Sequence, residues 1–169
     1  PFIEHATPVL ERLRDATRET VILGKRQGES VIYLQVIEGL HSIRYTAKPG
    51  EFKPLHSSSI GKALLGSLKE AELRVWLQGR ELAPITSATK TEHDALIQDV
   101  LESRRIGYFV TRGENVSDVW AVATFFMINN ETLAVAVAGP RHRIEGNVVE
   151  CANLLVATCS FLARQQARA

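Results

Sequence analysis

Residues 119–138, VWAVATFFMINNETLAVAVA, contain two runs of strand-forming residues on either side of Asn129-Asn130. Asparagine tolerates the positive backbone dihedral angles of a tight turn, so this stretch predicts a β-hairpin with a two-residue loop. Side chains alternate between the two faces of a strand. One face of the hairpin then carries small residues around a single phenylalanine: Ala121, Ala123, Phe125, Ala134, Ala136 and Ala138. The other face is bulky and is predicted to be core: Trp120, Val122, Thr124, Phe126, Leu133, Val135 and Val137.

The segments around this hairpin predict further strands and helices. Toward the N-terminus they indicate a helix from Thr7-Pro8 to about Arg18, strands at 20–25 and 30–37 joined through Gln27-Gly28-Glu29, and a third strand at 42–46. In the middle they indicate a helix from Ile60, a short helix capped by Ser67 and Glu70, a helix opened by Thr91 and closed by Gly107, and a strand at 108–111. A last helix runs from Ile144 to about Arg164. Strands that come in runs favour an α+β fold with a mainly antiparallel sheet of about six strands flanked by helices.

The composition is that of one globular domain without disorder: 169 residues, 45% of them hydrophobic and 23% charged, with a net charge of +1. Such a small positive excess does not neutralise a phosphate backbone, so we expect no DNA binding by this chain alone. The longest apolar run, 120–128, is about half the roughly 20 residues of a membrane helix. We therefore expect a soluble, cytoplasmic protein with no membrane contact. Because the chain begins with Pro1 and not Met, we expect it to be a fragment of a longer chain.

Two cysteines, Cys151 and Cys159, lie eight residues apart in the last predicted helix, about 12 Å from each other along its axis. This separation is too long for a disulfide, so we expect two buried thiols in a reducing compartment. The five histidines show no metal-ligand spacing with each other or with the cysteines. The sequence therefore predicts no metal and no cofactor.

The serine-rich stretch that ends in Lys62 precedes a predicted helix. It is not a phosphate-binding loop, since His56 stands where that motif needs glycine and Ala63 where it needs serine or threonine. The first turn of a helix presents unpaired backbone N–H groups and the positive end of the helix dipole. The turn from Ser57 to Gly61 therefore predicts an anion site, with Lys53 and Lys62 on either side of it in sequence.

The alanine face of the 119–138 hairpin has two interpretations. Either a helix backbone lies close over the alanines, or the alanines form the floor of a cavity for a small ligand. An apolar floor beside an anion-binding helix end suits a small organic carboxylate.

Four features occur in one order along the chain: Arg44 before Pro49-Gly50, PLHSSSIGKALL at 54–65, Ile106-Gly107-Tyr108, and Ala138-Gly139-Pro140. In this order they resemble the effector-binding domain of IclR-type bacterial transcriptional regulators, over essentially the whole chain. The resemblance implies that residues 1–169 form a single effector-binding domain with a GAF-like fold. It also implies a winged helix-turn-helix DNA-binding domain, absent from this fragment, and assembly into a homodimer or homotetramer. A small metabolite would tune binding to operator DNA, which only the missing N-terminal domain contacts.

The resemblance further implies which residues line the effector pocket: Tyr45, Lys53, Ser59, Ile60, Thr111, Val119, Ala121, Ala136 and Ala138. The chain departs from family members that bind small polar acids, which have an acidic residue in place of Thr111, a cysteine in place of Ala121, and serines in place of Ala136 and Ala138. The acidic pair that the family commonly has after Gly-Tyr is reduced here to Glu114. These departures predict a roomier, less polar pocket.

We therefore expect a larger organic carboxylate, aromatic or otherwise partly apolar, as the effector. Its carboxylate would lie on the backbone N–H groups of Ser59, Ile60 and Gly61, with Lys53 as counter-ion and Tyr45 stacked on its ring. Two alternatives stay open. One is a dimerisation module without a ligand, and the other is a hydrolase that uses the Ser57–Ser59 turn, for which His56 is the one nearby base. We expect a sensor domain and not an enzyme.

Overall fold

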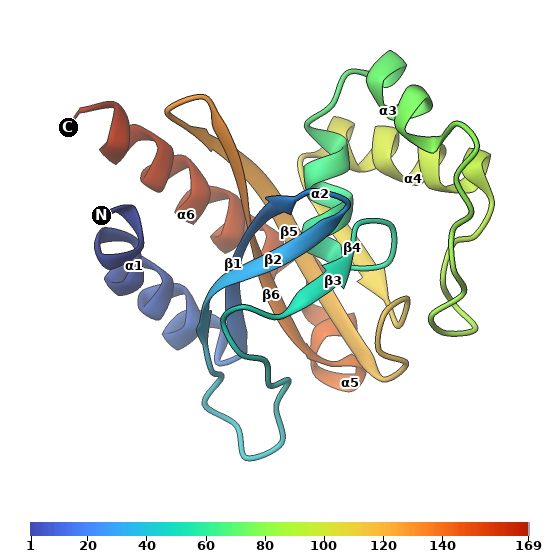
Figure 1. Ribbon diagram of the computed structural model, residues 1–169. Coiled ribbons are helices and arrows are strands. Elements are labelled where there is room, and N and C mark those ends of the chain that lie inside the picture. The colour runs from blue at the N-terminus through green and yellow to red at the C-terminus, as the bar shows by residue number, and fades with distance from the viewer. Residues whose placement is uncertain (169) are drawn as a thin grey trace.

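Six strands form one antiparallel sheet in the computed structural model of the protein, which describes residues 1–168. They are β1 (Thr20–Gln27), β2 (Ser30–Ile37), β3 (Phe52–Pro54), β4 (Phe109–Arg112), β5 (Val119–Ile128) and β6 (Glu131–Pro140). Their order across the sheet is β3-β2-β1-β6-β5-β4 (Figure 1). The predicted α+β fold with about six antiparallel strands is therefore confirmed.

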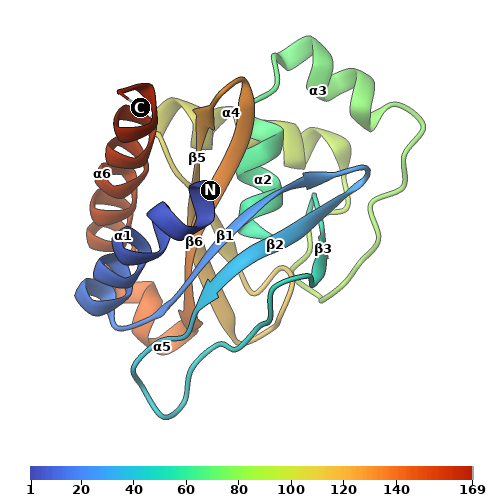
Figure 2. The same ribbon diagram turned by 60° about the vertical axis from the view of Figure 1, so that its left-hand side comes forward.

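Helices cover both faces of this sheet. They are α1 (Phe2–Thr17), α2 (Ser59–Gly66), α3 (Glu70–Leu77), α4 (His93–Ile106), α5 (Arg141–Ile144) and α6 (Val148–Ala167), with a 3₁₀ turn, η1 (Glu145–Asn147), between the last two. Figure 2 shows α1 and α6 side by side on one face, while α2, α3 and α4 lie on the other. The sheet therefore separates two hydrophobic cores.

The 119–138 hairpin has the predicted register, in which Ala121 pairs with Ala138 and Ala123 pairs with Ala136. The bulky face of the hairpin packs with α1 and α6 in the first core, which includes Val122, Val135 and Val137. The alanine face joins the second core, beneath α2 and α4. Asn129 and Asn130 both have positive φ angles, as the two-residue turn requires.

The predicted strand at 42–46 is wrong. These residues belong to an extended loop between β2 and β3, and the third strand is Phe52–Pro54, which pairs with the start of β2. Gly39 packs so closely against the backbone of Arg18 to Thr20 that a Cβ would overlap it, and the chain leaves the sheet at this point. The loop stays near β1 because the Thr20 hydroxyl donates to the Tyr45 carbonyl over 2.5 Å and accepts from the Gly39 N–H.

Three predicted helix starts are also wrong. Helix α1 begins at Phe2, and the Thr7 hydroxyl donates back to the Ile3 carbonyl instead of capping a new helix. The Ser67 hydroxyl donates to the Leu64 carbonyl at the end of α2, so α3 begins at Glu70 and not at Ser67. The helix expected to open at Thr91 begins at His93. In each case a local side-chain hydrogen bond or loop competes with the cap that the sequence suggests.

The helix end and the strand turn that the sequence predicts at two glycines agree with the structure. Gly107 ends α4 with φ 97°, and Gly28 lies at the β1–β2 turn with φ 61°. These positions need the left-handed conformation that glycine adopts at little cost.

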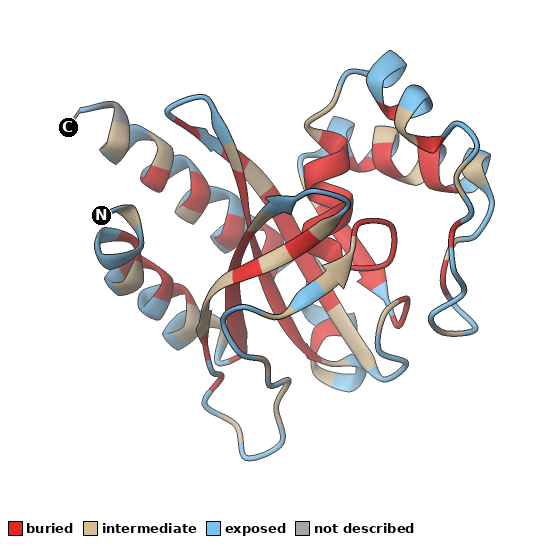
Figure 3. Cartoon of the chain, viewed as in Figure 1, coloured by how far each residue is buried: buried red, intermediate tan, exposed pale blue. Residues whose placement is uncertain are grey.

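The C-terminal helical segment is more apolar than the predicted helix from Ile144 suggested. The helical segment Arg141–Gln166 contains a window of 18 residues with a mean hydropathy of 1.4, which is long and apolar enough to cross a membrane, and 28% of that window is buried. One side of α6 nevertheless packs on the sheet through Ala152, Leu155, Cys159 and Leu162. As predicted, both thiols are free and buried, and burial raises the pKa of each. Figure 3 shows the other side of α6 in the colours of exposed residues.

Candidate functional site

A small cavity lies where the alanine face of the hairpin emerges from beneath α2. It has a volume of about 30 Å³. The lining comes from β1, β2, the 38–51 loop, the first turn of α2, β4, the 113–118 loop, β5 and β6: Ile22, Tyr33, Tyr45, Ser58, Ser59, Thr111, Asn115, Val116, Val119, Ala121, Ala136 and Ala138. Segments far apart in sequence therefore meet at one end of the sheet.

Seven of the ten residues predicted to bind a ligand line this cavity: Tyr45, Ser59, Thr111, Val119, Ala121, Ala136 and Ala138. The structure does not bring Lys53, Ile60 or Gly61 into the lining. Lys53 pairs with Glu51 over 3.2 Å, and its Nζ lies 5.8 Å from the centroid of the Tyr33 ring. Ile60 packs against Gly24 in the second core, and Gly61 lies against the backbone of Leu55.

The alanine face of the hairpin combines the two interpretations: a helix covers its deeper part, and its outer part forms the floor of a cavity. Ala123 and Ala134 are fully buried in the core that α2 closes. Ala121, Ala136 and Ala138 lie beyond the first turn of that helix, and they form the floor of the cavity. The expectation of a roomy pocket is wrong for this conformation, because about 30 Å³ accommodates water-sized molecules.

The three serines at the start of α2 have different roles. Ser58 is the N-cap, since its hydroxyl accepts from the Gly61 N–H over 3.0 Å and donates to the Pro54 carbonyl over 2.7 Å. Ser57 donates to the side-chain oxygen of Asn115 over 3.0 Å. Ser59, the first residue of the helix, lines the cavity, and its hydroxyl bonds to no described residue. The Gly61 N–H is thus occupied and is not part of an anion site.

Unpartnered donors face this cavity from two directions. Ser59 and Thr111 are 5% and 4% exposed, and within residues 1–168 neither hydroxyl has a hydrogen-bond partner. The backbone N–H of Ser59 likewise has no acceptor in the described part of the chain. It is one of the donors that helix geometry leaves free in a first turn. Together with the helix dipole these donors favour an anionic or strongly hydrogen-bonding group.

Two tyrosines close one side of the cavity, and one of them, Tyr33, was absent from the predicted lining. Burial and, after it, the neighbouring Tyr45 hydroxyl raise the pKa of Tyr33 above its usual value. Tyr33 is therefore a neutral phenol at physiological pH. Its position could have been found from the strand pattern, because Val31 and Tyr33 share the inward face of β2.

Asn115 and Val116 were also absent from the prediction, since nothing in the polar 112–118 segment distinguishes them. Hydrogen bonds hold their loop in place. Thr86 and Thr89 donate to the carbonyls of Gly113 and Glu114, over 2.6 and 2.7 Å. Ser57 orients the amide of Asn115 by donating to its oxygen, which leaves the amide N–H groups available to a ligand.

Lys62 does not flank an anion site, contrary to the sequence-based expectation. It is fully buried, and its Nζ donates to Asp99 over 2.5 Å, to the Val110 carbonyl over 2.8 Å and to Glu114 over 2.9 Å. Lys90 lies 3.4 Å from Asp99 and 3.7 Å from Glu114. Although burial alone would raise the pKa of Asp99, the charge and hydrogen bond of Lys62 hold it below its usual value. This ion cluster ties α2 to α4 and to the loop that carries Asn115.

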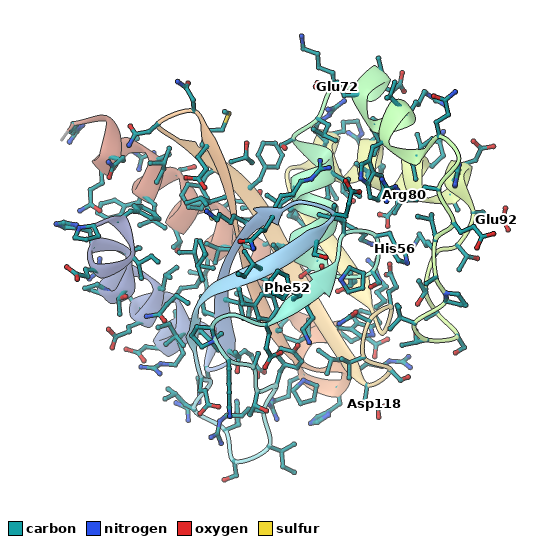
Figure 4. All side chains as sticks on the ribbon, in the orientation of Figure 1. Phe52, His56, Glu72, Arg80, Glu92 and Asp118 are labelled. Atoms are coloured by element: carbon teal, nitrogen blue, oxygen red, sulfur yellow. The ribbon has the colours of Figure 1, made fainter. Side chains whose placement is uncertain are left out.

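Among the described residues, the ring of His56 forms no hydrogen bond with the serine hydroxyls that a hydrolase would need. One of its ring nitrogens bonds to the Ala83 carbonyl over 2.8 Å. In Figure 4 His56 lies on the Arg80 side of the edge strand that carries Phe52. Within residues 1–168, no group of three or more His, Cys, Asp or Glu residues is arranged to hold a metal ion.

Comparison with protein families gives a match over residues 1–163 to the family described as bacterial transcriptional regulator IclR, C-terminal. A curated relative, the HTH-type transcriptional regulator BhcR of Paracoccus denitrificans, is 33% identical over 145 residues, which are 85% of this chain and 52% of that regulator. The chain therefore spans about half the length of the curated relatives it matches. These relatives are transcriptional regulators and not enzymes, in agreement with the expectation for this chain.

Solved structures agree with the fold. The Thermotoga maritima IclR structure superposes with a TM-score of 0.91 at 26% identity, covering 98% of this chain and 68% of that one. An IclR homologue from Microbacterium hydrocarbonoxydans, complexed with 4-hydroxybenzoate, has a TM-score of 0.87 at 20% identity and covers 99% of this chain and 69% of its own.

Proposed function

The chain belongs to the IclR family of bacterial transcriptional regulators, and we propose that it is the part that binds a small organic carboxylate and thereby modulates operator binding. In this proposal residues 1–169 form one effector-binding domain. Operator DNA is contacted by an N-terminal winged helix-turn-helix domain outside this sequence. That the chain spans about half of its curated relatives, which are named HTH-type regulators, supports this division. The protein would act in the cytoplasm as a homodimer or homotetramer.

The observation that carries the proposal is that the hydroxyls of Ser59 and Thr111, neither of which bonds to a described residue, line the cavity beside the free N–H of Ser59 in the first turn of α2. A ligand carboxylate that enters the cavity can accept hydrogen bonds from these donors. Since the lining formed by described residues includes no lysine, arginine or histidine, neutral donors and the helix dipole would hold the charge.

An aromatic acid needs more space than the cavity has in this conformation. Tyr45 and Val116 are the lining residues best placed to make room, because each lies on a loop and not on a strand, and Val116 is 40% exposed. Outward movement of these two loops would open the cavity above its alanine floor. The 4-hydroxybenzoate complex of the Microbacterium homologue supports an aromatic acid as the ligand class.

Signalling requires that the ligand bind one arrangement of the full-length protein better than another. The coupling free energy between effector and operator in such systems is typically about 1 to 3 kcal/mol. The domain would supply this coupling free energy if opening of the cavity changed how the domain packs against the other domains and subunits of the full-length protein.

Thermal unfolding of this chain against a panel of ligands tests the proposal. The panel contains benzoate and 4-hydroxybenzoate, the neutral analogue benzamide, and the short acids acetate and glycolate. A ligand at about 100 times its dissociation constant adds roughly 2.7 kcal/mol to the native state, which raises Tm by about 5 to 10 °C for a domain of this size. A shift with the aromatic acids but not with benzamide is expected, and a shift with the short acids alone would contradict the aromatic class.

The small volume of the cavity favours one alternative, a dimerisation module without a ligand. That function predicts no change in Tm with any compound of the panel. It also predicts that Ser59→Ala and Thr111→Val leave DNA regulation by the full-length protein unchanged.

A further inference from the structure

The outer side of α6 carries a continuous stripe of exposed residues. Glu150, Leu154, Ala157, Phe161 and Arg164 follow one another at intervals of four, three, four and three residues, and all five are exposed. This is the spacing of the seam along which two helices pack in a coiled coil. Leu154 and Phe161 are 41% and 38% exposed, although each is a large apolar side chain.

A groove runs beside this stripe, between α1 and α6. It has a volume of about 390 Å³ and is lined by Val9, Arg12, Leu13, Ala16, Leu154, Ala157, Thr158 and Phe161. Both views show the two helices side by side on the outside of the molecule (Figures 1 and 2). The surface is therefore an apolar stripe next to a hollow, which is the form that accepts side chains from another helix.

A membrane does not account for this surface. The opposite side of α6 is already packed on the sheet through residues such as Leu155 and Leu162. The helix therefore cannot be surrounded by lipid. The short helix α5, which precedes α6, is also anchored to the sheet. Arg143 in α5 forms two hydrogen bonds with the buried carboxylate of Glu19, over 2.8 and 2.9 Å.

The charges on the stripe indicate what covers it. Glu150 and Arg164 lie at opposite ends, about 21 Å apart along the helix, with Ala157 midway between them. Neither forms an ion pair with any residue that the structure describes. Against an antiparallel second copy of α6, each Glu150 would face an Arg164, whereas a parallel copy would place like charges together. The small side chain of Ala157 would then lie at the crossing point of the two helices.

We propose that a second copy of this chain docks on α6 in antiparallel orientation, with Leu154 and Phe161 of each copy filling the groove of the other. The interface is self-complementary, as a two-fold axis through Ala157 requires. This inference rests on the oligomeric part of the proposed function and does not depend on ligand binding.

Sedimentation velocity of this chain over a concentration series tests the surface. Leu154→Glu and Phe161→Glu each place two charges in an isologous interface, so we expect the dimer dissociation constant to rise at least about 100-fold. Val75→Glu is the matched control, because Val75 is 68% exposed on α3, on the other face of the sheet. It should leave the dissociation constant unchanged. Circular dichroism and thermal unfolding establish that each variant is folded.

Charge exchange tests the orientation. Glu150→Arg and Arg164→Glu should each weaken the dimer about 3- to 10-fold at low salt, since two attractive pairs become repulsive. The double variant Glu150→Arg/Arg164→Glu restores both pairs in an antiparallel dimer and should return the dissociation constant to the wild-type value. A double variant no tighter than the single ones would overturn the antiparallel arrangement.

The remaining outcomes are distinct. A dimer that Leu154→Glu and Phe161→Glu leave intact overturns this surface but not oligomerisation. A chain that stays monomeric at every concentration overturns both. Co-sedimentation of the wild-type chain with phosphatidylglycerol-phosphatidylethanolamine vesicles, abolished by Leu154→Glu, would assign the stripe to a membrane and overturn the proposal. The ligand-binding proposal stands or falls separately, by the Tm panel.

Discussion

Replacing Lys62 by methionine tests how the cavity is held together. Methionine keeps most of the apolar stem of lysine but removes the ammonium group, which bonds to Asp99, Glu114 and the Val110 carbonyl. Glu114 is 2% exposed, so its carboxylate would remain buried without its nearest cation. Its other oxygen accepts from the Arg112 N–H over 2.9 Å, and this bond alone does not neutralise the charge.

The magnitude follows from the burial of both partners. Removing one member of a buried ion pair costs about 3 to 5 kcal/mol, because an uncompensated charge is left behind. Lys90 lies 3.7 Å from Glu114 and is partly exposed, so it recovers part of this cost. We therefore expect Lys62→Met to lower the free energy of unfolding by about 3 kcal/mol at pH 7.

The loss of stability caused by Lys62→Met should depend on pH in one direction. In the wild type the pKa of Asp99 is lowered, so its pairing stabilises the fold fully above the pKa of an unfolded aspartate, about 3.9, and the contribution is lost as pH falls through the lower folded-state value. In Lys62→Met the carboxylate of Asp99 loses the charge and hydrogen bond that lower its pKa, and burial then favours its protonated form. The cost of the substitution should therefore be smaller at about pH 5 than at pH 7.

Urea denaturation at both pH values measures these differences. The double variant Lys62→Met/Glu114→Gln removes the stranded charge together with its partner, and it should be more stable than Lys62→Met alone. Lys25→Met is the matched control, because Lys25 forms an exposed pair with Glu131 and should cost less than about 1 kcal/mol. A Lys62→Met variant that costs no more than this control would refute the role of the ion cluster.

Three further predictions concern the cavity and its surroundings. Ala136→Leu fills the cavity floor, so it should abolish the Tm shift produced by the aromatic acids, while the exposed Ala71→Leu on α3 should preserve that shift; a normal shift with Ala136→Leu would place the ligand elsewhere. Ser58→Ala removes the N-cap and should cost about 1 kcal/mol in urea denaturation, whereas Ser59→Ala should leave stability unchanged and weaken ligand binding; equal effects on stability would contradict the division of roles between the two serines. Gly107→Ala places a Cβ at φ 97° and should lower the free energy of unfolding by about 1 kcal/mol, as measured by the same denaturation; a neutral result would show that this C-cap carries no strain.

Local patterns were sufficient to predict much of the fold. The 119–138 hairpin combines period-two alternation with a turn residue that accepts positive φ, so its register follows from the sequence. The cap at Gly107 follows in the same way from one residue type. The segment at 42–46 also alternates, but no neighbouring strand is available to it, because the chain leaves the sheet at Gly39. A weak alternation cannot reveal that a pairing partner is missing.

The sequence predicted the residues that line the cavity less completely than it predicted the fold. The alanines follow from the strand pattern, whereas Asn115 and Val116 lie in a loop whose position depends on Thr86, Thr89 and the buried ion cluster. The two lysines show the same limit. Lys53 and Lys62 both flank the serine turn in sequence, but Lys62 pairs with carboxylates 37 and 52 residues away, and Lys53 pairs with Glu51. A cation near a helix N-terminus is a candidate ligand only until its tertiary partners are known.

The alternation within β6 connects the two proposals. Ala136 and Ala138 face the cavity, while Val135 and Val137 face the core that supports α1 and α6. A single strand thus has the proposed ligand on one side and the helix that carries the proposed dimer surface behind the other. Close-packed interiors transmit small displacements because they contain little free space to absorb them. A ligand that enlarges a cavity of about 30 Å³ must displace either the two covering loops or this strand, and displacement of the strand would reach α6 through one layer of valines.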